Sequence, residues 1–520
     1  MDKFNMYTDE GTYVQIPVCE KMISQEMSTD FTLPDYQPEI KRLLRINASV
    51  LPPSGYFGTS DAEFSGNIDY YVLYIGSDGE IYCAPLSSEY TVNVPIDCDD
   101  IGAGFDGSAQ IFADSVSGRV TGPRKLSIRS KLKAMTHVYN NLPLGTNFGS
   151  DMDPSAVERL EGEINVAKII YSASDTVHVT DEIIPDSHAK DIRVICAEGK
   201  VIVNEVNAVN NEIICRGDVH LKVMMCREND GENDFEKRTF CITRKIPFSQ
   251  NISAEGVNTD ADCCAYGTVS ELNVDVEEGR IGVDVGLIIE ALAGINRNVK
   301  YTKDLYSTVC DSNAEYKRLL TPKSVGSFNG NFTLGDSVAL EDAGINPASA
   351  IIDSTGNAYI EECTCENGKC TISGKAKFNL QLQRSDEYSV SEIEFPFKYT
   401  VNLKDSNLHN AYDISCRAEV ISTRARIDSE RVGIDAEIAV CGSCMAIEEV
   451  SALDTVHFGE GFKTKRGEFV VCFPSSDDTL WSVAKRYRSH ISTVAEENQL
   501  QDSSSPDLNT SLSGVNYLLV

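Results

Sequence analysis

Three segments of this chain alternate apolar and polar residues with a period of two, and each segment begins with a glycine. After Gly374, apolar residues occupy every second position from Ala376 to Leu382, with lysine, asparagine and glutamine between them. The same pattern follows Gly66 and Gly217, so the three glycines are 151 and 157 residues apart. Such alternation is typical of a strand with one buried and one solvated face. It predicts that a β-rich unit occurs three times.

Other features of the sequence recur in the same order. A strand pattern that opens with a basic residue begins at Arg280 and at Arg431, with a weaker version at Lys125. A proline followed by an apolar residue closes a further strand in each copy, and proline favours a strand end or an edge because it has no N–H to donate. These pairs are Pro85-Leu86, Pro247-Phe248 and Pro396-Phe397.

Two longer similarities support the same interpretation. Residues 35–44 resemble residues 311–320, and residues 175–179 resemble residues 454–458. Repeats of about 150 residues are too long for a solenoid and indicate globular domains in tandem. We therefore expect a mainly β protein with repeat 1 over 1–174, a divergent repeat 2 over 175–302 and repeat 3 over 303–460.

The pattern changes to a helical one near the C-terminus. Leu480, Val483, Ala484 and Tyr487 follow the i, i+3, i+4, i+7 spacing of an apolar helix face. Acidic residues precede this helix, where a carboxylate favours the N-terminus. A second short amphipathic helix follows, and short apolar runs of strand type flank both helices. The order predicts a small βααβ domain over 466–520.

This C-terminal segment resembles a LysM domain, a module associated with binding N-acetylated glycans. The resemblance implies that the loops around the first helix and before the last strand hold a ligand or partner. The sequence departs from the family pattern at Asp477 and at Arg488, where the family usually has glycines, which favours a protein partner over a sugar. Alternatively, Trp481 is simply a core residue. The implied binding residues are Asp477, Asp478, Thr479, Leu480, Trp481 and Asn498.

The body of the chain resembles the SPOCS domain of clostridial sporulation and cell-surface proteins. The resemblance rests on residues 31–40, which read FTLPDYQPEI, and on the hairpin from Gly66 to Pro85. Three SPOCS-like copies followed by one LysM domain is similar to the layout of a clostridial spore-coat morphogenetic protein that binds the coat-basement ATPase. The resemblance implies a scaffold of spore-envelope (coat) assembly, located in the mother-cell cytoplasm at the forespore or spore-envelope surface. Its partner would be that ATPase or a similar spore protein. The alternative is a cell-wall or cortex protein that binds peptidoglycan through the LysM groove.

Composition excludes several classes of function. The net charge of −33 disfavours binding to nucleic acid or to an anionic membrane surface. No apolar run reaches the roughly 18 residues of a membrane-spanning helix, and the first ten residues lack the basic and apolar regions of a signal peptide. Phosphate-binding loops, zinc-protease motifs and nucleophile elbows do not occur. We therefore expect no enzymatic activity, no cofactor and no membrane span.

Seventeen cysteines raise the question of thiol chemistry. Most lie singly in strand-like runs, where a free thiol behaves as a small apolar side chain. Two local clusters have spacings that also suit a thiolate zinc site or later oxidative crosslinking. Unpaired thiols without a bound metal are the expected state, and the other two uses stay open. The clustered residues are Cys363, Cys365, Cys370, Cys441 and Cys444.

Overall fold

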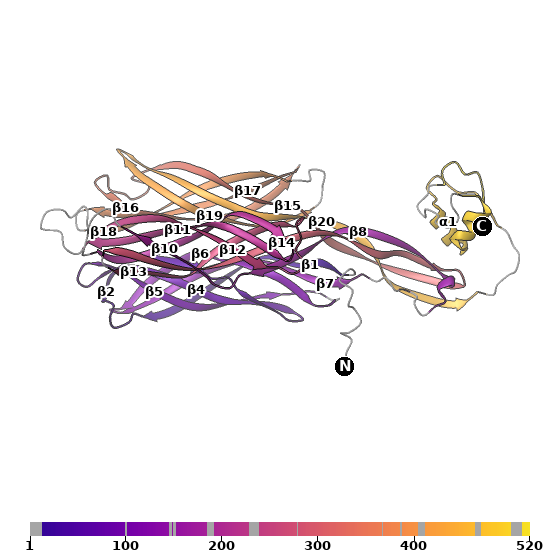
Figure 1. Cartoon of the computed structure of the whole chain (residues 1–520), viewed down its shortest axis with the longest axis horizontal. Coiled ribbons are helices and arrows are strands. Elements are labelled where there is room, and N and C mark those ends of the chain that lie inside the picture. Colours follow the sequence, from indigo (N-terminus) through magenta and orange to yellow (C-terminus); the bar gives the residue numbers. More distant parts are fainter. Residues whose placement is uncertain are drawn as a thin grey trace.

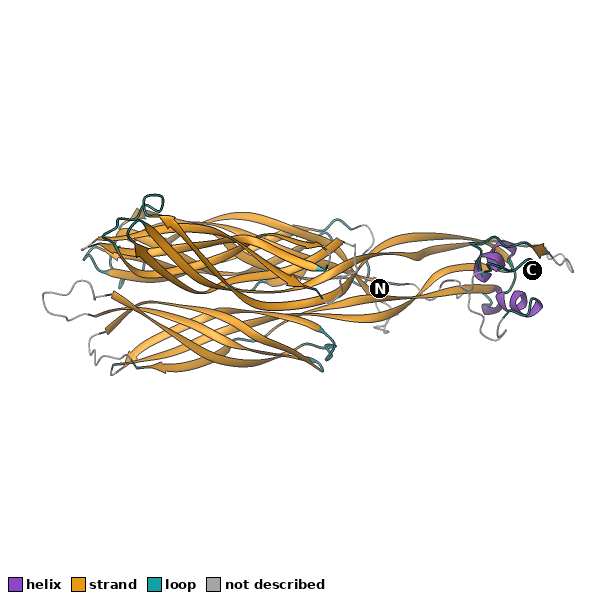
Figure 2. Ribbon diagram, turned by 90° about the horizontal axis from the view of Figure 1, so that it is seen from above, coloured by secondary structure: helices purple, strands orange, loops and turns teal. Residues whose placement is uncertain are grey.

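The protein is mainly β (Figure 2). The computed structural model describes residues 13–98, 101–144, 148, 152–184, 192–227, 239–277, 279–366, 368–384, 387–403, 411–462, 470–500 and 512–520. Within these ranges, the helices are α1 (Leu480–Tyr487), α2 (Ile491–Glu497) and a short 3-10 turn at Pro154–Ala156. No helix in the described part is long and apolar enough to cross a membrane.

The strands form three successive pairs of sheets. In the first sheet pair, one sheet has the order β1-β7-β6, and the other has the order β2-β4-β3 with β5 also on β4. All of these pairings are antiparallel. The strands are β1 (Tyr13–Thr32), β2 (Ile40–Val50), β3 (Ser54–Phe57), β4 (Asp61–Gly76), β5 (Ile81–Pro95), β6 (Phe105–Gly122) and β7 (Lys125–Pro143).

The second sheet pair follows the same plan. Its sheets have the orders β13-β14-β8, with β9 also on β14, and β10-β11-β12. The central strand of each sheet pairs antiparallel with both neighbours, as in the first pair. The strands are β8 (Val157–Ala173), β9 (Val177–Ile183), β10 (Ile192–Val209), β11 (Glu212–Arg227), β12 (Thr239–Ser253), β13 (Asp262–Glu277) and β14 (Arg280–Ser307).

The third sheet pair repeats this order with longer strands. Its sheets are β15-β20-β19 and β16-β17-β18. Side chains of Ile372, Phe378, Leu380 and Ile438 are fully buried between the two sheets. The strands are β15 (Cys310–Ala339), β16 (Ala350–Glu366), β17 (Lys369–Arg384), β18 (Glu387–Asn402), β19 (Ala411–Asp428) and β20 (Arg431–Gly461).

The glycine-led and basic-led sequence patterns fall on equivalent strands. Gly66, Gly217 and Gly374 lie in β4, β11 and β17, the central strands of one sheet in each pair. The basic-led pattern opens β7, β14 and β20, the central strands of the other sheet. The proline–apolar pairs lie in β5, β12 and β18, at sheet edges where a missing N–H costs no ladder hydrogen bond.

The two longer similarities do not mark equivalent positions. Residues 35–44 span the turn into β2, whereas residues 311–320 lie in β15, the first strand of its sheet pair. Residues 175–179 lead into β9, whereas residues 454–458 belong to the end of β20. Short polar–apolar patterns recur in many strands, so these two similarities are local. The prediction that they mark equivalent positions of the repeats was wrong.

Strand pairing also groups residues across the expected repeat boundaries. The boundary between 174 and 175 separates β8 from β9, yet both strands pair with β14. The boundary between 302 and 303 falls inside β14. These pairings join residues 98 to 150 positions apart, which local alternation of apolar and polar residues does not encode.

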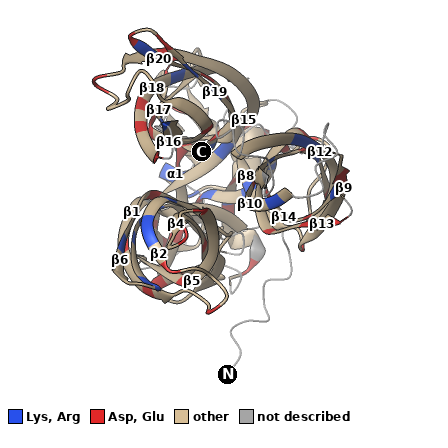
Figure 3. Cartoon of the chain, turned by 90° about the vertical axis from the view of Figure 1, so that its left-hand side faces the viewer, with Lys and Arg blue, Asp and Glu red and all other residues tan. Residues whose placement is uncertain are grey.

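The three sheet pairs lie side by side around a common long axis (Figure 3). A narrower stalk projects beyond them, formed by β8 and by the neighbouring parts of β14, β15 and β20 (Figure 1). The C-terminal part of the chain lies at the far end of this stalk. We call residues 470–500 and 512–520 the tail. In chain order it contains β21 (Val471–Cys472), α1, α2 and β22 (Leu518–Leu519), and β21 pairs antiparallel with β22.

Candidate functional site: the tail on the stalk

Helix α1 is fixed at both ends by specific residues. The Thr479 hydroxyl accepts a hydrogen bond from the Ser482 backbone N–H, and the Ser482 hydroxyl accepts one from the Thr479 N–H, which forms a capping box. Arg488 ends the helix in a left-handed conformation with φ of 58°. A non-glycine residue in this conformation costs roughly 1 kcal/mol.

Asp478 stabilises the loop that enters α1. Its buried carboxylate accepts hydrogen bonds from the Ser475 backbone N–H at 2.9 Å and from the Arg486 guanidinium at 2.6 Å. The backbone bond from Ser475, followed by Arg486, lowers the pKa of Asp478 to about 2. The Asp478 carboxylate therefore makes its hydrogen bonds within the tail itself.

The apolar face of α1 packs against the stalk. Leu480, Trp481 and Ala484 share a buried cluster with Leu160 of β8 and Tyr306 of β14. The rings of Trp481 and Tyr306 meet edge to face with centroids 5.0 Å apart. Offset and edge-to-face aromatic pairs add ~0.5–1.5 kcal/mol beyond their buried area. Trp481 is therefore a contact residue between tail and stalk.

Asp304 of β14 is the polar centre of this contact. Its carboxylate accepts a hydrogen bond from Trp481 Nε1–H at 2.8 Å, two from Lys485 Nζ at 2.6 and 2.7 Å, and one from the Tyr316 hydroxyl. Asp304 follows an irregularity in the pairing of β14 with β8, between Thr302 and Asp304, and such bulges redirect side chains. Partial burial acts to raise the pKa of Asp304, but these hydrogen bonds outweigh it and the pKa is lowered.

Further contacts surround the Trp481–Asp304 pair. The Tyr306 hydroxyl donates to the Ser489 carbonyl at 2.8 Å, beyond the end of α1. His490 Nδ1 lies 3.0 Å from a carboxylate oxygen of Glu158. The guanidinium of Arg488 pairs with Asp311 and stacks 4.1 Å above the Phe462 ring. The stalk strands β8, β14 and β15 thus all contribute to the contact.

Asn498 holds the tail's last strand in place. Its side-chain amide donates to the carbonyls of Val494 and Leu519 at 2.7 Å each, and its oxygen accepts from the Leu519 N–H at 2.7 Å. Asp477 is exposed at the loop surface. The other five predicted binding residues have structural roles: Thr479 caps α1, Asp478 and Asn498 make hydrogen bonds within the tail, and Leu480 and Trp481 contact the stalk.

No local pattern in the sequence points to Asp304 or Tyr306 as site residues. Both lie in an ordinary run of β14, 175 or more positions before Trp481. Asp304 is a single acidic residue among 79. Only the pairing of β14 with β8 and the position of the tail bring these side chains to α1.

Outside the stalk contact, the tail exposes apolar side chains. Along the β21–β22 pair, Cys472 and Leu518 point inward, whereas Val471 points outward. Phe473 and Tyr517 lie one step beyond the paired residues, and they are 76% and 58% exposed. We call Val471, Phe473 and Tyr517 the aromatic edge of the tail. Aromatic residues that combine large area with few rotatable bonds are common at binding surfaces.

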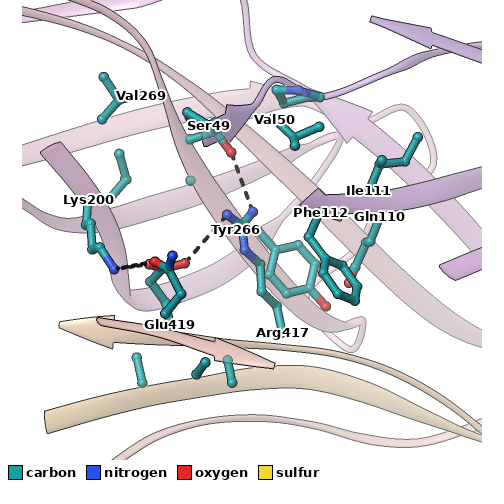
Figure 4. Close-up of a pocket in the computed structure, with 18 of the residues that line it drawn as sticks. Ser49, Val50, Gln110, Ile111, Phe112, Lys200, Tyr266, Val269, Arg417 and Glu419 are labelled. Atoms are coloured by element: carbon teal, nitrogen blue, oxygen red, sulfur yellow. Dashed lines mark hydrogen bonds and ion pairs between the residues drawn. The ribbon is translucent and has the colours of Figure 1, made fainter. Parts of the chain in front are cut away.

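A second candidate site is a cavity of about 260 Å³ where the three sheet pairs meet (Figure 4). Lys200 of the second sheet pair lies 2.7 Å from the Glu419 carboxylate of the third, and Arg417 flanks the same carboxylate at 3.8 Å. Burial acts to raise the pKa of Glu419, but Lys200 and Arg417 overcome it and the pKa is lowered. Each of these charges therefore has a partner of opposite sign within the wall.

Next to this cavity, Arg45 connects all three sheet pairs. Its guanidinium pairs with Glu198 of β10 and lies 3.4 Å from the Asp353 carboxylate of β16. Lys222 of β11 also reaches Asp353, at 2.7 Å. Burial works to raise the pKa of Asp353, whereas Lys222 and Arg45 lower it, and the lowering prevails. The arrangement is a buried ion network that fixes how the sheet pairs pack.

The clustered cysteines form close sulfur contacts. The Sγ atoms of Cys363 and Cys416 are 3.2 Å apart, and those of Cys365 and Cys444 are 3.9 Å apart. Cys370 is the strand partner of Cys365. Within the described residues, no group of three or more His, Cys, Asp or Glu side chains is arranged to hold a metal ion.

Comparison with known proteins identifies one segment. The family model of the SipL SPOCS domain matches residues 191–277, which comprise β10 to β13 of the second sheet pair. This segment lies within residues 175–302, which the sequence pattern predicted to be the divergent repeat 2. No curated protein and no solved structure matches the chain. The match supports a SPOCS-domain protein, and this family suggests a role related to sporulation.

Proposed function

We propose that this chain is a non-enzymatic scaffold of spore-envelope (coat) assembly that docks a protein partner through its tail. In this proposal the three sheet pairs are SPOCS-like copies, and the tail is a LysM-like domain. The family match over residues 191–277 supports the SPOCS interpretation. The recurring strand order supports its extension to the other two sheet pairs. The protein would act in the mother-cell cytoplasm at the forespore or spore-envelope surface.

The observation that carries the docking proposal is the division of the tail into two faces. One face, with Leu480 and Trp481, packs on the stalk. The other carries the aromatic edge, which leaves Phe473 and Tyr517 exposed to a partner. An exposed aromatic pair held on a stabilised strand pair suits an interface hot spot. The excess of acidic residues favours a partner with a basic surface.

The resemblance of the layout makes the coat-basement morphogenetic ATPase, or a similar spore protein, the proposed partner. The alternative ligand is a peptidoglycan glycan, because exposed aromatic rings also stack on sugar faces. A substitution of Trp481 would test neither ligand cleanly, because its ring and its Nε1–H already contact the stalk and the substitution would also disturb that contact.

The test compares the full-length chain with the variants Phe473→Ala and Tyr517→Ala. We expect both to lose at least tenfold in capture of the purified ATPase. Tyr56→Ala is the matched control, since Tyr56 is 73% exposed but lies in β3, far from the tail in sequence. Unchanged capture by both tail variants would reject docking through the aromatic edge. If the unsubstituted chain sediments with peptidoglycan and the Tyr517→Ala variant does not, the glycan alternative is favoured.

A further inference from the structure

Two cysteines from different sheet pairs meet at the seam between the first and second pairs. Cys83 of β5 and Cys196 of β10 are 113 residues apart in sequence, and their Sγ atoms are 3.4 Å apart. They lie within an apolar cluster that includes Leu73, Ile81 and Ile195 from both sides of the seam. Both side chains are free thiols.

We propose that Cys83 and Cys196 are an oxidisable pair whose disulfide locks the first sheet pair to the second, with a low-molecular-weight disulfide such as glutathione disulfide as the oxidant. This site is independent of the tail and of the proposed partner.

The geometry requires only a small movement. A disulfide bond is about 2.05 Å long, so the two sulfur atoms must approach by roughly 1.4 Å, which is within the reach of χ1 rotation. Neighbouring contacts already hold the strands together at this point. Arg193 of β10 donates to the Ile81 carbonyl of β5 at 3.2 Å, and its guanidinium lies 4.9 Å from the centre of the Tyr82 ring. The Arg45–Glu198 pair closes the same seam.

The exposures of the two thiols set the order of reaction. Cys83 is partly exposed, whereas Cys196 is buried. The neighbouring Cys83 thiol and burial raise the pKa of Cys196 well above its ordinary value. Cys83 is therefore the thiol that meets an oxidant first, and Cys196 is the resolving thiol.

The chemistry balances as two thiol–disulfide exchanges. The Cys83 thiolate attacks one sulfur of the oxidant, which forms a mixed disulfide and releases one small thiolate. The Cys196 thiolate then attacks the Cys83 sulfur, forms the protein disulfide and releases the second small thiolate. The two protons from the cysteines pass to the released thiolates, and the two electrons reduce the oxidant to two thiols.

The expected consequence is a more stable seam. The new bond would close a loop of 113 residues, and crosslinks that close long loops remove the most freedom from the unfolded chain. We expect oxidation to raise the urea midpoint of the full chain.

The experiment oxidises the folded, full-length protein with glutathione disulfide and maps its peptides without reduction. We expect a peptide in which Cys83 is linked to Cys196. The number of thiols lost on oxidation, counted in denaturant, should be two lower in Cys83→Ala than in the unsubstituted chain. Cys196→Ala should instead retain glutathione on Cys83. Cys241→Ala is the control, because Cys241 is a partly exposed thiol of the same cluster, and it should behave as the unsubstituted chain.

Three results would overturn the proposal. These are a stable glutathione adduct on Cys83 in the unsubstituted chain, a link from Cys83 to some other cysteine, and equal thiol loss in Cys83→Ala and the unsubstituted chain. A circular dichroism spectrum that oxidation leaves unchanged verifies that the protein reacted while folded. The two alanine variants are made separately, so that a folding defect in one does not remove the test.

Discussion

The indole N–H of Trp481 donates a 2.8 Å hydrogen bond to the carboxylate of Asp304, which joins the tail to a strand 177 residues earlier. The Lys485 ammonium binds the same carboxylate, and the Tyr306 ring packs against the indole. The only tryptophan of the chain is thus a structural contact between tail and stalk. Several expectations about stability depend on it.

Replacement of Trp481 by alanine should weaken tail docking. Truncation of a buried aromatic side chain typically costs ~3–5 kcal/mol, and here it also removes a hydrogen bond to Asp304. Trp481→Phe keeps a ring against Tyr306 and should lose mainly the hydrogen bond to the Asp304 carboxylate, and hydrogen bonds to charged groups are worth ~1.5–3 kcal/mol. Hydrogen exchange of the full chain measures the effect. Faster exchange in α1 and in residues 301–307 is expected for the alanine variant, and unchanged exchange there would contradict the docking contact.

Acidification should also release the tail. The pKa of Asp304 is lowered in the docked state by Lys485, Tyr316 and Trp481 against the opposing effect of burial. A carboxyl with a lowered pKa contributes stability above its ordinary value of about 3.9, and this contribution is lost as the pH falls through the folded-state pKa. We expect the protection of the α1 amides, measured as the exchange rate relative to the intrinsic rate at the same pH, to fall below about pH 4. The variant Asp304→Asn should show weaker docking at neutral pH and a smaller change on acidification.

Substitution of Arg45 by methionine should loosen the packing of all three sheet pairs. The guanidinium side chain is only 5% exposed and its partner Asp353 3%, so its removal leaves a buried carboxylate without one of its cations. Such losses cost ~3–5 kcal/mol. Arg426→Met is the matched control, because the Arg426 side chain is 70% exposed in its ion pair with Asp435, and exposed pairs contribute ~0–1 kcal/mol. Urea unfolding compares the two variants, and equal midpoints would contradict a central role of Arg45.

Position 488 should tolerate glycine but not valine. Arg488 has a left-handed backbone conformation that glycine adopts without strain. Arg488→Gly gains roughly 1 kcal/mol from the backbone and loses an exposed ion pair with Asp311, so the melting temperature should change little. Arg488→Val should lower it, because a β-branched residue is strongly disfavoured at positive φ. A melting temperature lower for glycine than for valine would contradict this account.

Isolation of residues 466–520 should yield a folded but less stable tail. Cys472, Val483, Leu512 and Leu518 form an apolar core within the tail itself. The face with Leu480 and Trp481 would lose its cover from Leu160 and Tyr306. We expect helical circular dichroism with a lower melting temperature than the tail has in the full chain. Loss of all helicity would show that the stalk is required for folding.

Periodicity in the sequence predicted the strands because side-chain direction alternates at every residue of a strand, so burial of one face leaves a visible pattern. Gly66, Gly217 and Gly374 thereby marked the central strands of three sheets. The i, i+3, i+4 spacing of Leu480, Val483 and Ala484 likewise predicted α1. The acidic residues expected to cap this helix do not cap it: Thr479 is the N-cap residue, and Asp478 binds Ser475 and Arg486 instead. The presence of a strand or a helix is a local property, because residues close together in the sequence determine it.

Tertiary structure alone decided how distant segments meet. No residue near Trp481 identifies Asp304 as its partner, and nothing around Cys83 identifies Cys196. Both contacts depend on register, strand twist and packing between sheets more than 100 residues apart in sequence. The sequence by itself therefore determined a mainly β chain with a small helical C-terminal segment. The packing of that segment on the stalk determined that Trp481 is buried there. Phe473 and Tyr517 remain exposed because side chains alternate along the strands and their neighbours Cys472 and Leu518 are the ones that enter the tail's core.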